Sequence, residues 1–190
     1  MKLLFRWIPL ALLSGCAVSV FAQTPAKLVP GQSEVVFVTK QMGVPVDGRF
    51  KKFDAQVTLD PKKPETGHVD FSIDMLSASM GIAETDSEMP KPIWFNTAKY
   101  PQATFQSTAI KGLGGGKFEV AGKINIKGNA RDMVVPVVIT QAGGNSTATG
   151  SFVLKRLEFK IGEGEWADTT VVANDVTVKF KLVLTGLGAL

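Results

Sequence analysis

Apolar and polar residues alternate along most of the chain that follows Pro30. In the segment 69–75 the odd-numbered positions hold Val, Phe, Ile and Met, whereas the even-numbered positions hold Asp, Ser and Asp. The same period of two recurs in the segments 54–60, 118–127 and 176–185. Alternation of this kind is typical of strands with one buried face and one solvent-facing side. It favours an antiparallel sheet, because parallel sheets are normally covered on both faces.

Turn-forming residues separate these segments. Runs rich in Gly, Pro, Asn and Asp occupy 60–67, 112–116, 127–131 and 142–145. Strands are predicted to begin near Ser33, Phe53, His68, Ala103, Lys117, Met133, Thr147, Leu157 and Val171. So many strands in one chain predict an all-β, antiparallel closed barrel of about eight strands, because closure removes unpaired edges.

Three places interrupt the alternation. The segment 79–92 lacks it, and within it the residues 84–89 predict one or two helical turns, stopped by the prolines that follow. A short helix there would lie at one end of the barrel. The phase of alternation slips between Leu154 and Leu157, which predicts a bulge or a corner. Pro136 predicts an edge or bulged position in its strand.

The positions assigned to the barrel interior are large and apolar. The chain has twelve phenylalanines and six methionines against one tyrosine. An eight-stranded barrel is either filled by its own side chains or holds one small ligand, and alternation alone does not distinguish the two. The residues assigned to the interior are Phe37, Phe50, Val57, Phe71, Ile73, Phe105, Val120, Ile124, Phe152, Phe159, Phe180 and Leu182.

Residues 1–22 have the features of a secretory signal peptide. Two basic residues precede an uncharged apolar stretch, which ends in small residues at Val20 and Ala22. Cleavage after Ala22 would leave residues 23–190 as one mature domain. The sequence Leu-Ser-Gly-Cys that ends at Cys16 also fits the site at which bacterial lipoproteins are acylated, so lipidation is a second interpretation. A retained membrane anchor is disfavoured, because the stretch is shorter than the about 20 apolar residues that span a bilayer.

Few residues offer catalytic or metal-binding chemistry. His68 is the one histidine and Cys16 the one cysteine, so no transition-metal site is predicted. With His68 at the start of a strand, a Ser–His–Asp triad is not expected either. The glycine run 112–116 lacks the Gly-Lys-Ser/Thr of a phosphate-binding loop. The carboxylates at 163–168 lie in a glycine-spaced loop and are interpreted as solvated charges.

The charge balance is mild. The formal net charge is +4, and residues 1–22 contribute two of the basic side chains. Nucleic-acid-binding proteins usually carry a clustered basic face, and no such cluster is evident here. The sequence therefore predicts neither an enzyme nor a nucleic-acid partner.

Several spaced motifs carry a resemblance to a known family. The segment 94–105 holds an aromatic pair, a polar tetrad, Tyr-Pro and then Ala-Thr-Phe after an intervening Gln. Further matches are Val-Asp-Gly-Arg-Phe at 46–50, Leu-Asp-Pro at 59–61 and the strand-turn segment 120–128. The segment 154–166 ends in Gly-x-Gly-x-Trp. Together these motifs resemble the YceI family of periplasmic, lipocalin-like isoprenoid-binding proteins, over about Leu28 to Leu184.

The resemblance implies a periplasmic lipocalin-like barrel that binds the tail of a long isoprenoid, either a polyprenyl phosphate or a quinone, without a cofactor. The chain departs from many members at Gln32, Gln41 and Lys127, near which those members have histidines, and at Thr85, where they have arginine before the aspartate. Its head-group contacts are therefore expected to differ. The residues expected at the mouth of the barrel are Asp86, Met89, Trp94 and Trp166.

The resemblance also implies an alternative function. A branch of the family with these features is often encoded near, or fused to, membrane cytochromes of the b type. This association favours a quinone over a polyprenyl phosphate. It also raises a second hypothesis, in which the protein is an adaptor for a membrane cytochrome b or another electron-transport component. Assembly into a homodimer is left open.

Overall fold

The computed structural model describes residues 25–190, and most of its regular structure consists of strands. The expected signal peptide and the Cys16 acylation site lie outside the described residues. The strands are β1 (Ala26–Leu28), β2 (Glu34–Gln41), β3 (Val44–Phe50), β4 (Phe53–Thr58), β5 (His68–Asp74), β6 (Ala78–Ser79), β7 (Gln102–Gly114), β8 (Lys117–Ile126), β9 (Asn129–Ala142), β10 (Asn145–Lys155) and β11 (Asp175–Thr185). The helix α1 spans Ala83–Glu88, and short 3-10 turns lie at Pro30–Gln32, Pro64–Thr66, Met75–Ser77, Arg156–Phe159 and Gly164–Ala167. No helix within residues 25–190 is both long and apolar enough to cross a membrane.

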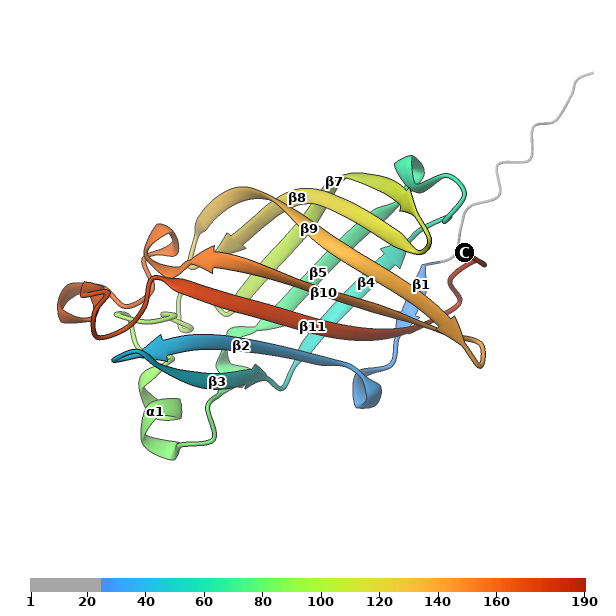
Figure 1. Cartoon of the computed structure of the whole chain (residues 1–190). Coiled ribbons are helices and arrows are strands. Elements are labelled where there is room, and N and C mark those ends of the chain that lie inside the picture. The colour runs from blue at the N-terminus through green and yellow to red at the C-terminus, as the bar shows by residue number, and fades with distance from the viewer. Residues whose placement is uncertain (1–24) are drawn as a thin grey trace, which may run out of the picture.

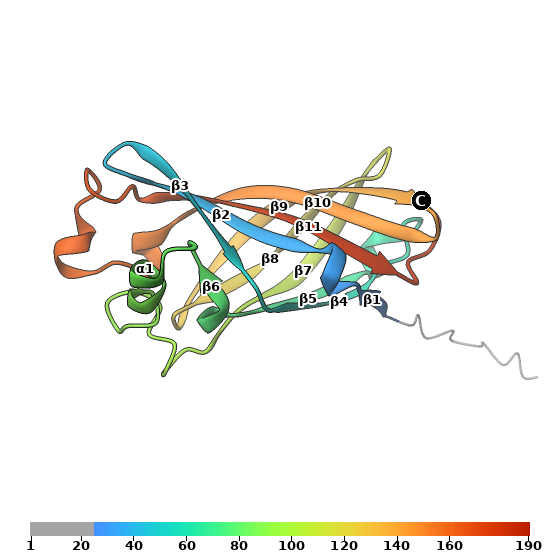
Figure 2. The same cartoon turned by 90° about the horizontal axis from the view of Figure 1, so that it is seen from below.

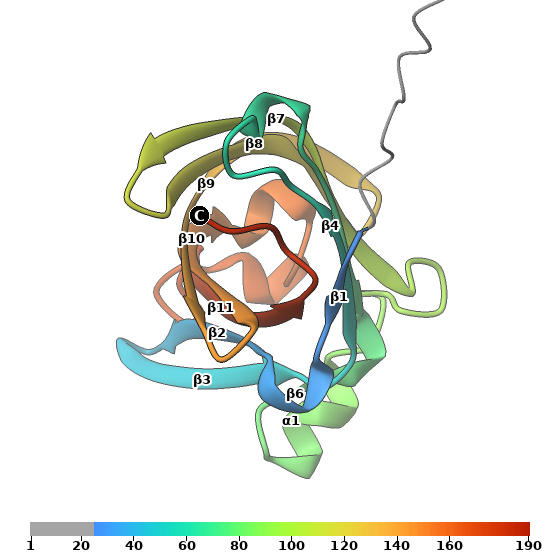
Figure 3. The same ribbon diagram turned by 90° about the vertical axis from the view of Figure 1, so that its right-hand side faces the viewer.

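The sheet closes on itself (Figures 1 and 3). Its strands follow the order β1-β4-β5-β7-β8-β9-β10-β11, and β11 pairs in turn with β1. Every pairing is antiparallel. The strand β2 pairs with β11 and β3, and β6 pairs with β3. The expected closed antiparallel barrel of eight strands with one short helix is confirmed.

At three of the eight strand positions around the barrel, the chain bends part-way along and two consecutive short strands take the place of one long strand (Figure 2). These pairs are β1/β2, β3/β4 and β5/β6. At one bend the amide of Lys51 donates to the carbonyl of Ser77 at 3.1 Å, and the amide of Asp74 donates to that of Lys52 at 3.0 Å. The Ser77 hydroxyl accepts from the Lys52 amide at 3.0 Å. We call these residues, 51–52 and 74–77, the corner.

The two ends of the barrel differ. One end, which we call the helical end, carries α1 and the long segments 89–101 and 156–174 (Figure 1, left). The other, the turn end, carries the connections at 59–67, 115–116 and 143–144. Residues 186–190 pass across the turn end (Figure 3), where the Gln141 amide donates to the Gly188 carbonyl at 2.7 Å.

Most predicted elements are present, with exceptions in irregular regions. The helix α1 lies where alternation stops, and the slip in alternation between Leu154 and Leu157 marks the end of β10 at Lys155. Leu157 does not begin a strand; it lies in the 3-10 turn that follows. The last strand begins at Asp175 rather than near Val171. The strand β3 was not expected by itself, because Pro45 and Gly48 weaken its strand pattern.

Pro136 occupies a local edge, as its sequence position predicted. The ladder between β9 and β10 ends at the pair Val137–Gly150, so residues 129–136 pair with β8 alone. A residue without an amide hydrogen fits where the ladder stops. The turn 156–159 lies beside this separation, with the Arg131 guanidinium donating to the Glu158 carbonyl at 3.0 Å.

Candidate functional site: an apolar cavity inside the barrel

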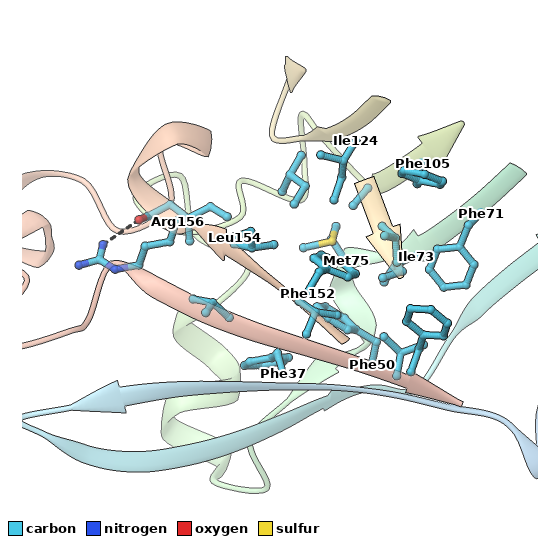
Figure 4. Close-up of a pocket in the computed structure, with 18 of the residues that line it drawn as sticks. Phe37, Phe50, Phe71, Ile73, Met75, Phe105, Ile124, Phe152, Leu154 and Arg156 are labelled. Carbon is cyan, nitrogen blue, oxygen red and sulfur yellow. Dashed lines mark hydrogen bonds between the residues drawn. The ribbon is translucent and has the colours of Figure 1, made fainter. Parts of the chain in front are cut away.

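The barrel is hollow. A cavity of about 810 Å³ runs from Gln41 and Trp166 at the helical end to Leu59 and Leu184 near the turn end. Its wall is formed mainly by aromatic and aliphatic side chains from the inward faces of the strands (Figure 4). This volume lies within the range of about 300–1,000 Å³ of small-molecule sites. The question left open by alternation is thus answered in favour of a hollow interior.

Glycines on the inward face help to keep the cavity open. At Gly48, a β-carbon would lie 2.1 Å from the ring of Phe37, which is its partner on the neighbouring strand. The phenylalanine ring therefore occupies the space next to the wall that a side chain would otherwise fill. Gly150 and Phe180 are partners in the same way. The Phe105 ring covers Gly122 diagonally, because Gly122 itself pairs with Ser107. The aromatic rings can line the barrel in this way without filling its centre.

Nearly all residues assigned to the interior line this cavity. They are Phe37, Phe50, Val57, Phe71, Ile73, Phe105, Val120, Ile124, Phe152, Phe180 and Leu182. Phe159 is the exception. It is 2% exposed and lies in the turn after β10, where it packs with Met75, Ile126 and Ile161 at the helical end. Strand alternation does not apply at Phe159, because the strand has already ended. That the wall residues contact a lipid stays a prediction.

Three of the four residues expected at the mouth line the helical end of the cavity: Met89, Trp94 and Trp166. The two tryptophan rings lie 5.5 Å apart, and the Gly162 amide donates to the Ile93 carbonyl at 2.9 Å, which joins the two long segments.

Asp86 does not line the cavity. Its carboxylate accepts hydrogen bonds from the Ser79 hydroxyl and the Met80 amide, both at 2.6 Å. These two hydrogen bonds lower the pKa of Asp86 below its ordinary value. The carboxylate therefore fixes the connection between β6 and α1, and it is bonded to the chain rather than lining the cavity.

Thr39, Glu84 and Glu88 also line the mouth and were not expected there. Thr39 continues the inward positions of β2, and the two glutamates come from α1. Gln41 and Thr85, two of the positions at which the head-group contacts are expected to differ from those of other family members, line the cavity at the same end. The alternation of β2 was a signal that could have found Thr39, since Val35 and Phe37 precede it on the same face. No comparable signal marks the carboxylates of α1, because their direction depends on where the helix packs.

Arg156 is the other unexpected residue, and this buried cation has no carboxylate partner among residues 25–190. Its side chain is 2% exposed and lines the cavity near the mouth (Figure 4). Burial lowers its pKa from the ordinary value. Each of its five N–H groups can be assigned to a backbone carbonyl, within 3.0 Å: those of Ile161, Gly162, Trp166, Val172 and Ala173. Arg156 thereby fastens the segment 161–173 over the helical end.

Lys127 is a second buried cation at this end, but it lies outside the cavity wall. Its ammonium group donates to the Lys160 carbonyl and to the Glu163 carboxylate, the latter at 3.0 Å. It holds the β8–β9 turn against the segment 156–174. Lys127 therefore forms its polar contacts with other residues of the chain.

A Ser–His–Asp grouping, which was not expected, does occur on the barrel. His68 Nε2 lies 2.9 Å from Asp70 Oδ2, and His68 Nδ1 lies 3.3 Å from Ser107 Oγ. The Ser107 hydroxyl also accepts from the Val69 amide at 2.8 Å, and Ser107 is 8% exposed at a β-bulge. None of these residues lines the cavity. The Ser107 hydroxyl therefore serves as a hydrogen-bond partner for groups at the β-bulge, and it is not exposed as a nucleophile.

Within residues 25–190 no three histidine, cysteine, aspartate or glutamate side chains gather in an arrangement that could hold a metal ion. The chemistry that the cavity wall can offer is therefore apolar contact along its length, with hydrogen bonding confined to the helical end.

Comparison with known proteins identifies the family. A family model described as the YceI-like domain matches residues 27–184. The chain belongs to the YceI-like family. Among curated relatives, protein YceI of Escherichia coli O157:H7 is 33% identical over 96 residues, half of each chain. A UPF0312 protein of Photorhabdus laumondii is 30% identical over 146 residues, which are 72% of this chain and 76% of that protein. The chain spans about half the length of the first curated relatives that it matches.

Solved structures share the fold. BcnA of Burkholderia cenocepacia is 44% identical, with a TM-score of 0.81 over 83% of this chain and 99% of that one. A polyisoprenoid-binding domain of Saccharophagus degradans is 18% identical, with a TM-score of 0.70 over 85% of this chain and 98% of that one. The second similarity is one of fold alone. The resemblance to the YceI family is confirmed.

Proposed function

We propose that this protein is a periplasmic binding or carrier protein for a long-chain isoprenoid lipid, either a polyprenyl phosphate or a quinone, held inside the barrel. The observation that carries the proposal is the apolar cavity of about 810 Å³, which runs along the barrel and is polar only toward the helical end. A long apolar chain with one polar head fits such a wall. The name of the structural neighbour from S. degradans points to the same class of ligand.

The energetics favour a shielded tail. Exposure to water costs roughly 0.8 kcal/mol per CH₂, so each five-carbon isoprene unit costs about 4 kcal/mol. Transfer from a bilayer to the cavity exchanges one apolar surrounding for another, and the net cost of extraction is correspondingly small. The polar residues at the mouth would then set which head groups are accepted.

The periplasmic location is part of the proposal. It rests on the signal-like residues 1–22, with cleavage after Ala22 or acylation at Cys16 as the two alternatives. The intact mass of the exported protein distinguishes them. A mass that begins at Gln23 supports cleavage, and the added mass of a diacylglyceryl group on Cys16 supports lipidation.

Native mass spectrometry of the protein purified from its own cells tests the binding function. We expect a bound species whose added mass matches an isoprenoid. Ala103→Trp should remove it, because Ala103 lines the cavity and is 7% exposed. A hollow barrel should accept the added ring with little loss of stability. Ala109→Trp, at an exposed position outside the cavity wall, is the matched control.

Two outcomes would contradict the proposal. One is a parent protein without any bound lipid that also fails to take up added isoprenoids. The other is an Ala103→Trp variant that binds as well as the parent. Gly122→Leu is not a suitable probe, because its β-carbon would lie 2.4 Å from the backbone oxygen of Gln106.

A further inference from the structure

The polar part of the cavity wall limits which head group the mouth can accept. Polar residues that line the cavity are Thr39, Gln41, Glu84, Thr85, Glu88, Thr104 and Arg156. Toward the turn end the lining residues are apolar, including Leu59, Phe118, Ile139 and Leu184. A lipid tail would therefore occupy the turn-end half, with its head group among these polar side chains.

Among the described residues, those that line the cavity offer no available cation. Arg156 is the basic residue among those of the described chain that line the cavity, and its five N–H groups are directed to five backbone carbonyls. Phosphate recognition relies on N–H or ammonium donors that can turn toward the phosphate oxygens. A guanidinium held by five carbonyls cannot turn without releasing the segment 161–173.

The mouth also carries negative charge. Glu84 and Glu88 lie one turn apart on α1 and both line the cavity. Glu88 forms an ion pair with Lys91, whereas Glu84 has no ion pair among the described residues. A phosphate or pyrophosphate placed beside these carboxylates would be repelled, and this repulsion would be reduced but not removed by salt.

One buried polar group is available. The Thr39 hydroxyl has no hydrogen-bond partner among the described residues, and Thr39 is 8% exposed on the cavity wall. A buried hydroxyl without a partner destabilises a protein, so such groups are uncommon and call for an explanation. A rotation about one side-chain bond would let the hydroxyl donate to an oxygen atom at the head of a ligand.

We propose that the mouth selects an isoprenoid with an uncharged, hydrogen-bond-accepting head, such as a quinone carbonyl or an alcohol, and discriminates against phosphate. In this arrangement Thr39 donates the hydrogen bond and the α1 carboxylates exclude anions. The inference rests on the proposed function, since it presupposes that an isoprenoid tail occupies the barrel.

Probes that share one tail but differ in their head group test the inference. Menaquinone-4, geranylgeraniol and geranylgeranyl phosphate carry the same C20 tail, and the C20 hydrocarbon phytane has no head group. Each competes with a fluorescent isoprenol for the full-length protein. We expect menaquinone-4 and geranylgeraniol to bind at least about 10-fold more tightly than the phosphate. Glu84→Gln combined with Glu88→Gln should narrow that difference at low salt.

Variants of Thr39 test the role of its hydroxyl. Thr39→Val keeps the shape, so it should weaken menaquinone-4 by about 5-fold and leave phytane unchanged, since one neutral hydrogen bond has about that effect. Thr39→Ser should restore the quinone affinity. Thr140→Val, on the exposed face of β9, is the control for a threonine outside the cavity.

The possible failures can be told apart. Equal or tighter binding of the phosphate would overturn the selectivity while leaving the lipid-binding function intact. A Thr39→Val variant that binds menaquinone-4 like the parent, or that loses phytane equally, would overturn the role of the hydroxyl. If neither phytane nor any headed probe competes, the proposed function itself fails and the inference fails with it.

Discussion

Gly48→Ala is the substitution that best tests how the width of the cavity affects ligand binding. A β-carbon at Gly48 would lie 2.1 Å from the Phe37 ring, and its nearest neighbours are all atoms of that ring. The ring must retreat by about 1.3 Å to reach an ordinary contact of 3.4 Å. Backbone atoms block the equivalent change at Gly122 and Gly150, at 2.4 and 2.6 Å, so those two positions would mix the effect with a shift of the wall.

The displaced ring has free space on its cavity side. Phe37 lines the cavity and its ring centroid lies 5.2 Å from that of Phe50, so the two rings would crowd the same part of the lumen. Overpacking of a filled core typically costs 1–3 kcal/mol. Here the ring enters free space, and alanine is favoured over glycine in a strand by roughly 0.5–1 kcal/mol. The free energy of unfolding should therefore change by less than about 1 kcal/mol.

Binding should respond much more strongly than stability. We expect the affinity for a C20 isoprenoid to fall by about 10-fold or more, which corresponds to about 1.4 kcal/mol. The melting temperature should shift by no more than about 4 °C, as expected for a domain of this size. Fluorescence competition measures the affinity, and thermal unfolding followed by circular dichroism measures the stability.

Two further variants complete this experiment. Phe37→Leu combined with Gly48→Ala should recover much of the affinity, because the smaller side chain leaves room for the new methyl group. Gly31→Ala is the control, since a β-carbon there has nothing within 4 Å. A Gly48→Ala variant with unaltered affinity would refute the idea that the glycine sets the width of the cavity. Severe destabilisation, with Gly31→Ala unaffected, would show a filled wall rather than a hollow one.

Other predictions concern the groups that hold the barrel together. Arg156→Lys should lower the free energy of unfolding by at least about 2 kcal/mol in urea titrations, because three donors cannot replace five; full stability would contradict the clamp. The pKa of Asp86 lies below 3.8, so its stabilising contribution is present above pH 3.8 and is lost as the pH falls through the lower folded-state value. Stability profiles of the parent and Asp86→Asn should therefore converge only in acid, and a constant offset there would contradict this. Ser107→Ala should destabilise the β-bulge by about 1 kcal/mol without altering lipid affinity, whereas a specific loss of binding or of any hydrolytic activity would refute a structural role.

The strand part of the barrel could be predicted because it is periodic. Alternation identified the inward residues of β4, β5, β8 and β11, and all of the strand residues assigned to the interior line the cavity. Phe159 was misassigned for the same reason, since alternation was extended past Lys155, where the strand ends. It could not be predicted from alternation that the interior is hollow, because the free space depends on phenylalanine rings that lie over glycines of a neighbouring strand.

The helical end was harder to predict because long-range packing determines it. The five carbonyls that accept hydrogen bonds from Arg156 lie 5 to 17 residues after it in the sequence, and no periodic pattern predicts that they meet at its guanidinium group. Local hydrogen bonding, by contrast, determines the position of Asp86. Its carboxylate was expected at the mouth of the cavity, yet it accepts hydrogen bonds from Ser79 and Met80, which lie just before α1. Backbone groups next to a short helix compete effectively for such a carboxylate.

The corner gives the barrel wall an uneven stiffness. The strands β7 to β11 run unbroken for 10 to 14 residues each, whereas the other three strand positions of the barrel are each divided between two shorter strands. Bending is easiest where a ladder is interrupted, so deformation of the tube should concentrate along residues 51–52 and 74–77. The panel formed by β2, β3 and β6 would then swing as one piece and widen the helical end, while the turn end keeps a constant diameter. Amide hydrogen exchange should accordingly be faster at Lys51, Lys52 and Asp74 than in the centre of β8.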